Sequence, residues 1–191
     1  NELQEKVYDK AFNKIKENKS DDKKLQIHED TELMQISNIV YPNNKGDIKE
    51  YYGNRGLKNI FTIRNNKYTY KDPKDPIFDL QNLKNYSIKL HELLNKIKNS
   101  RGIIFIYSQY IQSGVIPLMI SLEQNGYENY SGNNILNYPE WKKDGKYTKR
   151  RPVSYDKDSK NFKQAKYITI TGDNDISKNN DEEIRDLIAE E

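Results

Sequence analysis

Two apolar runs in this sequence are each followed by small polar residues that could bind a phosphate group. Ser108 and Gln109 follow the run at residues 103–107, and Thr171 and Gly172 end a second run. In open α/β sheets, ligands bind outside the carboxyl ends of the parallel strands. Hydroxyl, amide and backbone N–H donors there can hold a DNA or RNA backbone without reading its sequence. The sequence therefore predicts that these four residues contact a nucleic-acid backbone.

A structural role is the alternative for the first of these pairs. Serine is a favoured residue at the N-terminal cap of a helix, and a helical pattern begins shortly after Ser108 and Gln109. The residue pattern alone leaves both roles open.

A basic stretch at residues 141–166 is the second candidate for binding a nucleic acid. It holds ten Lys or Arg against three Asp, interleaved with four aromatic residues. Basic and aromatic side chains together can neutralise phosphates and stack on the bases of a single strand. The densest part of the stretch is Lys149, Arg150 and Arg151. The alternative is a solvated loop, because charge runs are usually just that.

The residue types exclude several kinds of catalytic or metal site. The chain has 191 residues and no cysteine, which excludes disulfides, thiolate zinc sites and a cysteine nucleophile. His28 and His91 are isolated, with no second histidine at helical spacing from either, so we expect no metal site. No Gly-x4-Gly-Lys-Ser/Thr loop is present to cradle the phosphates of ATP.

Charge and hydropathy give a broad expectation about the location of the protein. The formal net charge is only +3, so an argument for a polyanionic partner rests on local charge. No apolar run approaches the roughly 20 residues that span a bilayer. The lack of cysteine fits a reducing compartment. We therefore expect an intracellular protein with no membrane partner.

The elements expected around the first polar pair alternate in the manner of an α/β fold. Leucine, isoleucine and tyrosine at helical spacing predict an amphipathic helix over residues 79–100, with Asp79 as its cap. Residues 103–107 predict a short apolar strand of the kind that is buried in a parallel sheet. A helix is then expected after Ser113, with Pro117 in its first turn. The order helix, strand, helix is typical of an α/β domain.

The second polar pair follows a similar pattern later in the chain. Residues 128–166 have no clear periodicity and are interpreted as a basic insertion or long loop. Residues 167–171 predict a second strand, and a helix with acidic residues in its first turn is expected from about Asn180.

The N-terminal part of the chain predicts helical and hairpin structure. Residues 2–19 are helix-prone, and alternating apolar residues on both sides of Asn65 and Asn66 predict a small β-hairpin. We therefore divide the chain into a helical linking region with a hairpin over residues 1–78 and an α/β part over residues 79–191.

Three stretches of the sequence carry a resemblance to a known protein family. They are "YSIKLHELLNKIKNSRGIIFIYSQYIQSGVIPLMISLEQNGY", "YITITGDNDISKNNDEEIRDLI" and "LMQISNIVYP". In the first, a helix leads into an apolar strand that ends in Ser-Gln, followed by a helix that ends in Gly-Tyr. These stretches resemble the start of the second RecA-like lobe of superfamily 2 helicases of the Swi/Snf-related branch. The continuation through Ser113, Gly114 and Pro117 is similar to helicases and transcription-associated ATPases of large nucleocytoplasmic DNA viruses.

The resemblance implies a partial RecA-like lobe that grips one nucleic-acid strand. Ser108 and Gln109 would contact the sugar-phosphate backbone, and Thr171 and Gly172 would lie beside the same strand. ATP and magnesium would bind in the parent protein, between this lobe and a first RecA-like lobe of the same chain. For a viral protein of this kind, the location would be the cytoplasm, a viral factory, the nucleus or the virion.

Departures from the family pattern limit what this chain is expected to do alone. Asp181 begins "DEEI", which resembles the magnesium-binding acidic box of helicases, but it opens a helix instead of ending a strand. The Gln-x-x-Gly-Arg-x-x-Arg motif with its arginine finger does not occur. We therefore expect a fragment that holds no cofactor and is inactive by itself. The alternative is a non-enzymatic α/β protein-interaction module with a basic loop.

Overall fold

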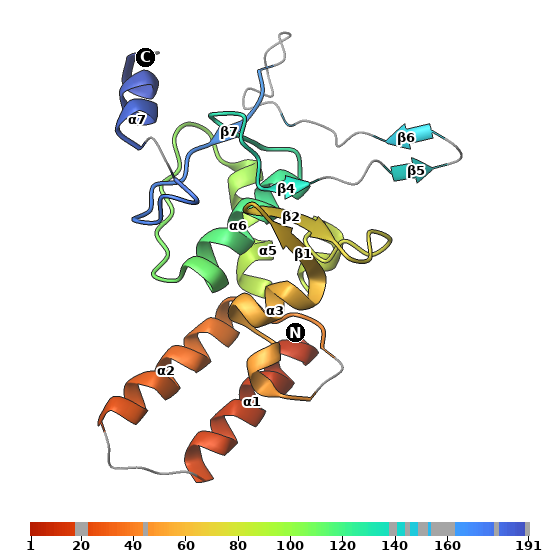
Figure 1. Ribbon diagram of the computed structural model, residues 1–191, viewed down its shortest axis with the longest axis vertical. Helices are drawn as coiled ribbons and strands as arrows, with labels where there is room; N and C mark the ends of the chain where they lie inside the picture. The colour runs from red at the N-terminus through yellow and green to blue at the C-terminus, as the bar shows by residue number, and fades with distance from the viewer. Residues whose placement is uncertain are drawn as a thin grey trace.

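The computed structural model describes residues 1–17, 23–43, 46–137, 141–143, 146–148, 153, 163–177 and 180–189. Within these residues the chain combines helices with three small sheets, which is consistent with the predicted α/β class. Two N-terminal helices lie at one end of the molecule, and the largest sheet lies among helices in the middle (Figure 1). In this described part, no helix has both the length and the apolar character needed to cross a membrane.

The N-terminal part is a pair of helices packed against each other. α1 (Glu2–Glu17) and α2 (Lys23–Asn38) lie below the rest of the molecule in Figure 1. The Gln4 side chain donates through Nε2 to the carbonyl oxygens of Ile36 and Ser37, 2.8 and 3.0 Å away. These bonds occupy two backbone acceptors in the last turn of α2, where a helix has no donor partners of its own. The helix predicted over the first residues is thus confirmed as far as Glu17.

The predicted β-hairpin is confirmed, including its turn. β1 (Phe61–Arg64) and β2 (Lys67–Tyr70) pair antiparallel. Asn65 and Asn66 join them with φ angles of 48° and 58°, the left-handed conformation that a two-residue hairpin turn needs. β4 (Leu136–Asn137) adds to β2 in parallel and completes a three-stranded sheet.

One hydrophobic core joins the hairpin to the helices around it. At its centre the fully buried Tyr41 ring lies against α3 (Gly53–Ile60). A Cβ atom at Gly56 would lie 2.3 Å from Cδ2 of Tyr41, so only glycine allows this approach. The core takes residues from both sides of position 78, among them Ile39, Leu57, Phe61, Tyr68, Phe78, Leu83, Leu94, Met119, Ile120 and Leu136.

The helix predicted over residues 79–100 is divided into two. α4 (Leu80–Leu83) begins at the predicted cap, Asp79. α5 (Ile88–Asn99) begins at Ser87, whose Oγ accepts a backbone N–H of the first turn at 3.0 Å and donates to a carbonyl oxygen at the end of α2. The prediction of one helix was wrong because the apolar spacing continues across this break, while the serine cap starts a new helix there.

The remaining elements are short, apart from two helices. They are η1 (Ile48–Glu50), a 3-10 helix, η2 (Ile111–Val115), a π-helical turn, α6 (Ile116–Gln124), β3 (Glu128–Asn129), β5 (Trp141–Lys143), β6 (Lys146–Thr148), β7 (Lys166–Tyr167) and α7 (Asn180–Ala189). β3 pairs with β7 in parallel, and β5 pairs with β6 antiparallel. The helix expected from about Asn180 is confirmed as α7.

A buried carboxylate fixes the segment that follows α6. Glu123 is 0% exposed, and its two carboxylate oxygens accept the backbone N–H groups of Ile135 and Leu136 at 2.8 and 2.6 Å. The Tyr167 hydroxyl donates to the same carboxylate. A buried charge requires such hydrogen bonds to offset its lost hydration. Glu123 therefore ties α6 to β4 and β7.

The two predicted strands that lead to the polar pairs differ from expectation. Residues 103–107 form no strand, and all five side chains are exposed, from 37% at Ile106 to 93% at Phe105. The second predicted strand, at residues 167–171, is paired only at its start, within Lys166–Tyr167. A strand needs the backbone of a neighbour to form its hydrogen bonds, and no described segment pairs with residues 103–107. The two runs do not pair with each other in the described part of the chain.

Replacing Tyr41 with phenylalanine should stabilise this fold. The Tyr41 hydroxyl is buried and has no hydrogen-bond partner among the described residues, and burial raises the pKa of Tyr41 well above its ordinary value. An unpaired buried hydroxyl costs about 1–3 kcal/mol. Urea unfolding of Tyr41→Phe at neutral pH should show a gain of about 1 kcal/mol in the free energy of unfolding.

The matched control for this prediction is Tyr51→Phe. The Tyr51 hydroxyl donates to the Asn43 carbonyl oxygen at 3.4 Å, so its removal deletes a hydrogen bond and should bring no gain. A Tyr41→Phe protein less stable than the parent would show that the Tyr41 hydroxyl is paired in solution.

Candidate nucleic-acid interface

The first predicted polar pair forms a tight turn ahead of η2. Ser108 Oγ accepts the N–H of Tyr110 at 3.4 Å and donates to the carbonyl oxygen of the same residue at 3.2 Å. The Ser108 side chain is half-buried, and its hydroxyl is occupied by this local turn. The Ser108 hydroxyl therefore has a structural role in a local turn. It is not the helix cap that the sequence offered as the alternative, because the N-cap of η2 is Tyr110 and no side chain caps that helix end.

Gly114 makes room for the Ser108 hydroxyl. A Cβ atom at Gly114 would lie 2.0 Å from Ser108 Oγ and 3.1 Å from Ser108 Cβ. Distances this short require the serine or the backbone to move. The serine turn and the glycine thus form one packing unit, in which each residue limits the other.

Gln109 is the member of the pair whose side chain faces solvent. It is exposed and makes no hydrogen bond with any described residue. Its amide offers two N–H donors and one carbonyl acceptor. Of the two predicted contacts at this turn, Gln109 is therefore the one whose donors are available to a ligand.

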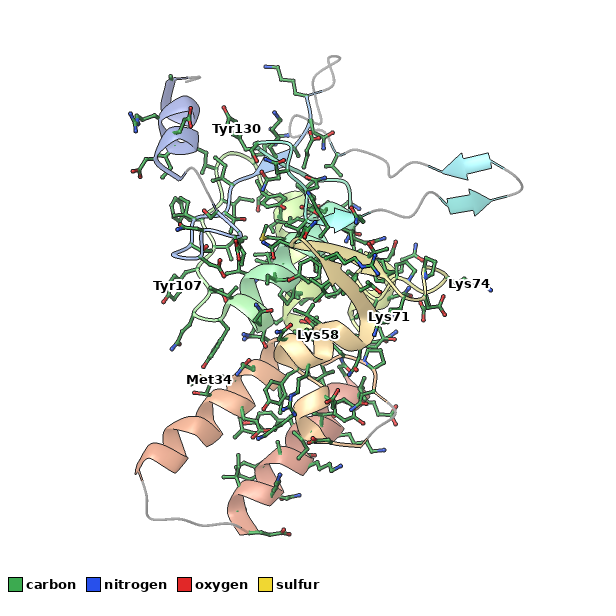
Figure 2. All side chains as sticks on the ribbon, in the orientation of Figure 1. Met34, Lys58, Lys71, Lys74, Tyr107 and Tyr130 are labelled. Carbon is green, nitrogen blue, oxygen red and sulfur yellow. The ribbon has the colours of Figure 1, made fainter. Side chains whose placement is uncertain are left out.

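A groove of about 270 Å³ lies beside this turn. Its walls come from the end of α2, the start of α5, residues 106–110 and the helix that follows, through Met34, Ser37, Asn38, Lys89, Leu90, Leu93, Ile106, Tyr107, Ser108, Gln109, Tyr110, Ser113, Gly114 and Leu118. Figure 2 shows Met34 and Tyr107 on the same side of the molecule. The groove is mainly apolar and aromatic, with a few polar groups.

Among the described residues, one cation and no carboxylate line the groove. Lys89 lies at the start of α5, and its Nζ donates to Asn38 Oδ1 at the end of α2, 2.7 Å away. An ammonium group has three donors, so this bond leaves two for a ligand. The local charge therefore favours an anionic ligand over a cationic one.

A buried serine connects the groove to α2 and α3. Ser113 is 1% exposed, and its Oγ accepts the Gly53 N–H at 3.1 Å and donates to Gln35 Oε1 at 2.9 Å. Gly53 has a φ angle of +60°, which glycine adopts readily. This network holds the start of α3, α2 and the turn before α6 in one arrangement.

The second predicted polar pair forms a turn of the same design elsewhere in the molecule. Thr171 Oγ1 accepts the N–H of Asp173 at 3.1 Å and donates to its carbonyl oxygen at 3.2 Å. Gly172 is exposed, and a Cβ atom there would meet nothing within 4 Å. Neither residue lines the groove beside Ser108. The structure therefore does not bring the two pairs into one pocket.

The Thr171 turn lies beside the β-hairpin. Asn66 donates through Nδ2 to the Asp175 carbonyl oxygen at 3.4 Å. Burial, together with the negative charge of Asp173, raises the pKa of the Tyr68 hydroxyl to about 12. Tyr68 belongs to the hydrophobic core beneath this turn.

The basic cluster and the acidic residue at the start of α7 do not add to this groove in the described structure. Lys149, Arg150 and Arg151 lie outside the described residues. Asp181, considered as a magnesium ligand, is exposed in the first turn of α7, and its carbonyl oxygen accepts the Arg185 Nε–H at 3.0 Å. Within the described residues, no group of three or more His, Cys, Asp or Glu could hold a metal ion.

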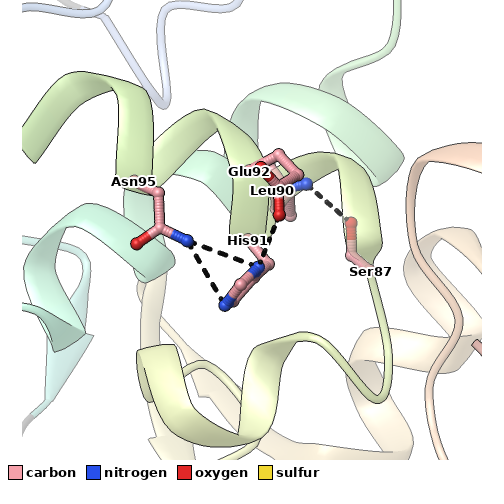
Figure 3. A network of polar contacts seen from close by, with 5 residues as sticks. All are labelled: Ser87, Leu90, His91, Glu92 and Asn95. Atoms are coloured by element: carbon pink, nitrogen blue, oxygen red, sulfur yellow. Dashed lines mark hydrogen bonds and ion pairs between the residues drawn. The ribbon is translucent and has the colours of Figure 1, made fainter.

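His91 is held by neighbours on its own helix. Its Nδ1 lies 3.2 Å from Glu92 Oε1, and the Asn95 amide lies 3.3 Å from its Nε2 (Figure 3). Ser87 caps the same helix. These interactions give His91 a local role on α5.

Two proteins of Acanthamoeba polyphaga mimivirus are similar to this chain. "Putative ATP-dependent RNA helicase L377" is 28% identical over an alignment that covers 72% of this chain and 16% of the relative. "Putative ATP-dependent RNA helicase R563" is 32% identical, over 51% of this chain and 14% of the relative. The chain is distantly similar to viral helicases. No family model and no solved structure matches it.

The similarity covers a small part of each relative. The chain spans about a sixth of the length of the first and 14% of the second. It therefore relates this chain to a helicase region, in agreement with the resemblance inferred from the sequence motifs. The Swi/Snf-related branch is not decided by these relatives.

Sequence reasoning missed several residues that shape the groove. Met34, Gln35, Asn38 and Lys89 come from α2 and α5, far from Ser108 along the chain. The only usable signal was the family resemblance, because both segments fall within or next to stretches that carry it. No local periodicity indicates which side chains meet across such distances.

Gly114→Ala and Ser108→Ala should have coupled effects on stability. Gly114→Ala forces the new methyl group onto the Ser108 hydroxyl, and overpacking of this kind costs about 1–3 kcal/mol. Removing that hydroxyl in the Ser108→Ala background relieves the shortest of these distances. Urea unfolding of both single variants and the double variant should therefore show that Gly114→Ala costs less when Ser108 is already alanine.

Strict additivity would contradict this coupling. The control is Gly172→Ala, where the added methyl group meets no atom within 4 Å and should change the free energy of unfolding little. Equal losses for Gly114→Ala and Gly172→Ala would mean that the Ser108 turn relaxes freely.

Proposed function

We propose that this chain is a nucleic-acid-binding region of an ATP-dependent helicase of superfamily 2, in the Swi/Snf-related branch. The observation that carries the proposal is that an exposed amide, Gln109, and a cation, Lys89, line one groove in which the described residues include no carboxylate. The chain that forms this groove is similar to viral helicases. Amide and ammonium donors bind phosphate oxygens without regard to base sequence.

In this proposal the hydroxyls of Ser108 and Thr171 hold two separate turns in shape and do not contact the ligand, and only the Ser108 turn lies at the groove. Ser108 shapes the turn from which Gln109 projects, and Thr171 shapes the turn that carries the exposed Gly172. A phosphate can approach the Gly172 backbone closely because no side chain covers it. Lys149, Arg150 and Arg151 add long-range attraction for the same strand.

RNA is the nucleic acid that we propose as ligand. The names of both mimivirus relatives describe RNA helicases. The donors of the groove suit the backbone of RNA or DNA, so the preference for RNA rests on the relatives alone. A role in viral transcription would use such a ligand.

ATP and magnesium belong to the parent helicase in this proposal, and the residues of this chain do not fit them. The sequence has no phosphate-binding loop of the Gly-x4-Gly-Lys-Ser/Thr kind, and the described residues hold no acidic cluster for a metal. The chain alone should therefore bind nucleic acid without hydrolysing ATP. A first RecA-like lobe of the parent protein is the partner that would supply this chemistry.

The exposed apolar run favours a second role as a protein-contact surface. Phe105 and Tyr107 are 93% and 89% exposed, and Ile103 is 71% exposed. A continuous exposed apolar stretch commonly marks an interface. If another part of the same helicase packs on this run, the groove can still bind a nucleic acid. If a different protein packs there, the alternative of a protein-interaction module is favoured.

Gln109→Ala should weaken binding of RNA to this chain. Loss of an amide that bonds to a charged phosphate costs about 1.5–3 kcal/mol, or roughly a tenfold to hundredfold rise in Kd. The measurement is a fluorescence-anisotropy titration of labelled single-stranded RNA, repeated with single-stranded DNA and with duplexes. The expected loss is the same for different base sequences, because the interaction is with the backbone.

The matched control is Gln81→Ala, which removes an exposed glutamine from α4, outside the groove. It should leave Kd unchanged. If Gln109→Ala and the unsubstituted chain bind RNA with equal affinity, Gln109 does not belong to the interface. If the folded, unsubstituted chain binds no nucleic acid at low salt, the proposal is overturned.

Lys89→Gln should reduce the salt dependence of binding. Removing one cation that neutralises a phosphate of a single strand lowers the slope of log K against log salt by about 0.7. Titrations at several salt concentrations should therefore give a shallower slope for Lys89→Gln than for the parent chain. Lys84→Gln, at an exposed lysine between α4 and α5, is the control and should retain the parent slope. An unchanged slope for Lys89→Gln would exclude a phosphate interaction there.

A further inference from the structure

We infer that the groove beside Ser108 is a stacking site for one unpaired nucleobase, with Tyr110 as its aromatic platform. This inference rests on the proposed function and adds a base contact to the backbone contacts of Gln109 and Lys89. The predicted contacts all involve the sugar-phosphate backbone, whereas this site would bind a base.

The size and lining of the groove suit a small planar group. Sites for drug-sized ligands have volumes of about 300–1,000 Å³, and this groove is slightly smaller, at about 270 Å³. Its apolar wall includes Met34, Leu93 and Leu118. Met34 is 52% exposed, although methionine side chains are most often buried. A base that enters the groove would cover this apolar surface.

The Tyr110 ring is oriented before any ligand binds. Its hydroxyl donates to Met34 Sδ at 3.3 Å, which links the turn to α2. The side chain is half-buried, unlike that of Tyr107, which is 89% exposed. A platform that is already fixed loses less conformational entropy on binding than a free one. Tyr110 is therefore the better of the two tyrosines for stacking.

Charge places the phosphate of the same nucleotide at one wall of the groove. Lys89 lies on α5 and donates to Asn38, while Tyr110 and Gln109 line the groove from the turn that follows residue 107. In the described part of the chain, no carboxylate lines the groove to repel a phosphate. An aromatic ring beside a cation is the combination with which proteins bind single strands, through stacking and phosphate neutralisation. A paired base within a duplex cannot enter such a groove without leaving its stack.

The test uses the full chain and short single-stranded RNAs that carry a fluorescent adenine analogue at one position each. Stacking on tyrosine quenches such an analogue. We expect quenching at one position or more for the parent chain and for Tyr110→Phe, which keeps the ring, and its loss for Tyr110→Leu. Because stacking is worth about 1–3 kcal/mol per base, Kd should rise roughly tenfold in Tyr110→Leu. Tyr8→Leu removes a tyrosine of α1 and should change neither quantity.

A second arm leaves the protein unchanged, so it does not depend on how the variants fold. The same RNAs with one base removed should bind the parent chain about tenfold more weakly at the position that is quenched. Equal binding of the abasic and intact RNAs, or quenching that persists in Tyr110→Leu, would overturn the base site.

The outcomes separate this inference from the function on which it rests. If Gln109→Ala weakens binding but no position is quenched, backbone binding stands and the base site falls. If the folded parent chain binds no RNA or DNA at low salt, both fall.

Discussion

The arrangement around the groove depends on two hydrogen bonds of the buried Ser113 hydroxyl. This one oxygen accepts a backbone N–H from the start of α3 and donates to Gln35 on α2, at 3.1 and 2.9 Å. Ser113 is only 1% exposed, so water cannot replace a lost partner. Loss of either partner would therefore leave a buried polar group unpaired, at a cost of about 1–3 kcal/mol. The bond therefore fixes α2 against the turn before α6. Met34 and Asn38 lie on the same helix as Gln35, so their positions in the groove wall follow from that attachment.

Two hydroxyl turns show how the polar residues after each apolar run are used. Ser108 and Thr171 each bond to both the N–H and the carbonyl oxygen of the residue two positions later. Such bonds satisfy backbone groups where the chain changes direction. The hydroxyls are then engaged within the chain, and the neighbouring residues, Gln109 and Gly172, are the ones that face outward. The glycine at position 114 belongs to this design, since any larger residue would displace the serine.

Local rules predicted the parts of the fold that local interactions determine. The Asn65–Asn66 turn, the Asp79 cap and the start of α7 each follow from a few neighbouring residues, and each was found from the sequence. The strand predicted at residues 103–107 was not, because apolar β-branched residues form a strand only where another backbone pairs with them. The groove could be predicted only in part. Ser108 and Gln109 were identified by type, whereas Lys89 and Met34 reach it through tertiary packing that no spacing rule contains.

The exposed run at residues 103–107 and the groove are physically continuous, which links protein contact to ligand binding. Ile106 and Tyr107 belong to the run and also line the groove. A protein segment that covered the run would contact these two side chains, and so would a ligand seated in the groove. If both events constrained the same side chains, their free energies would be coupled, and such a coupling is reciprocal. In a helicase, such a link would let the contact between this region and the rest of the protein change the grip on a single strand.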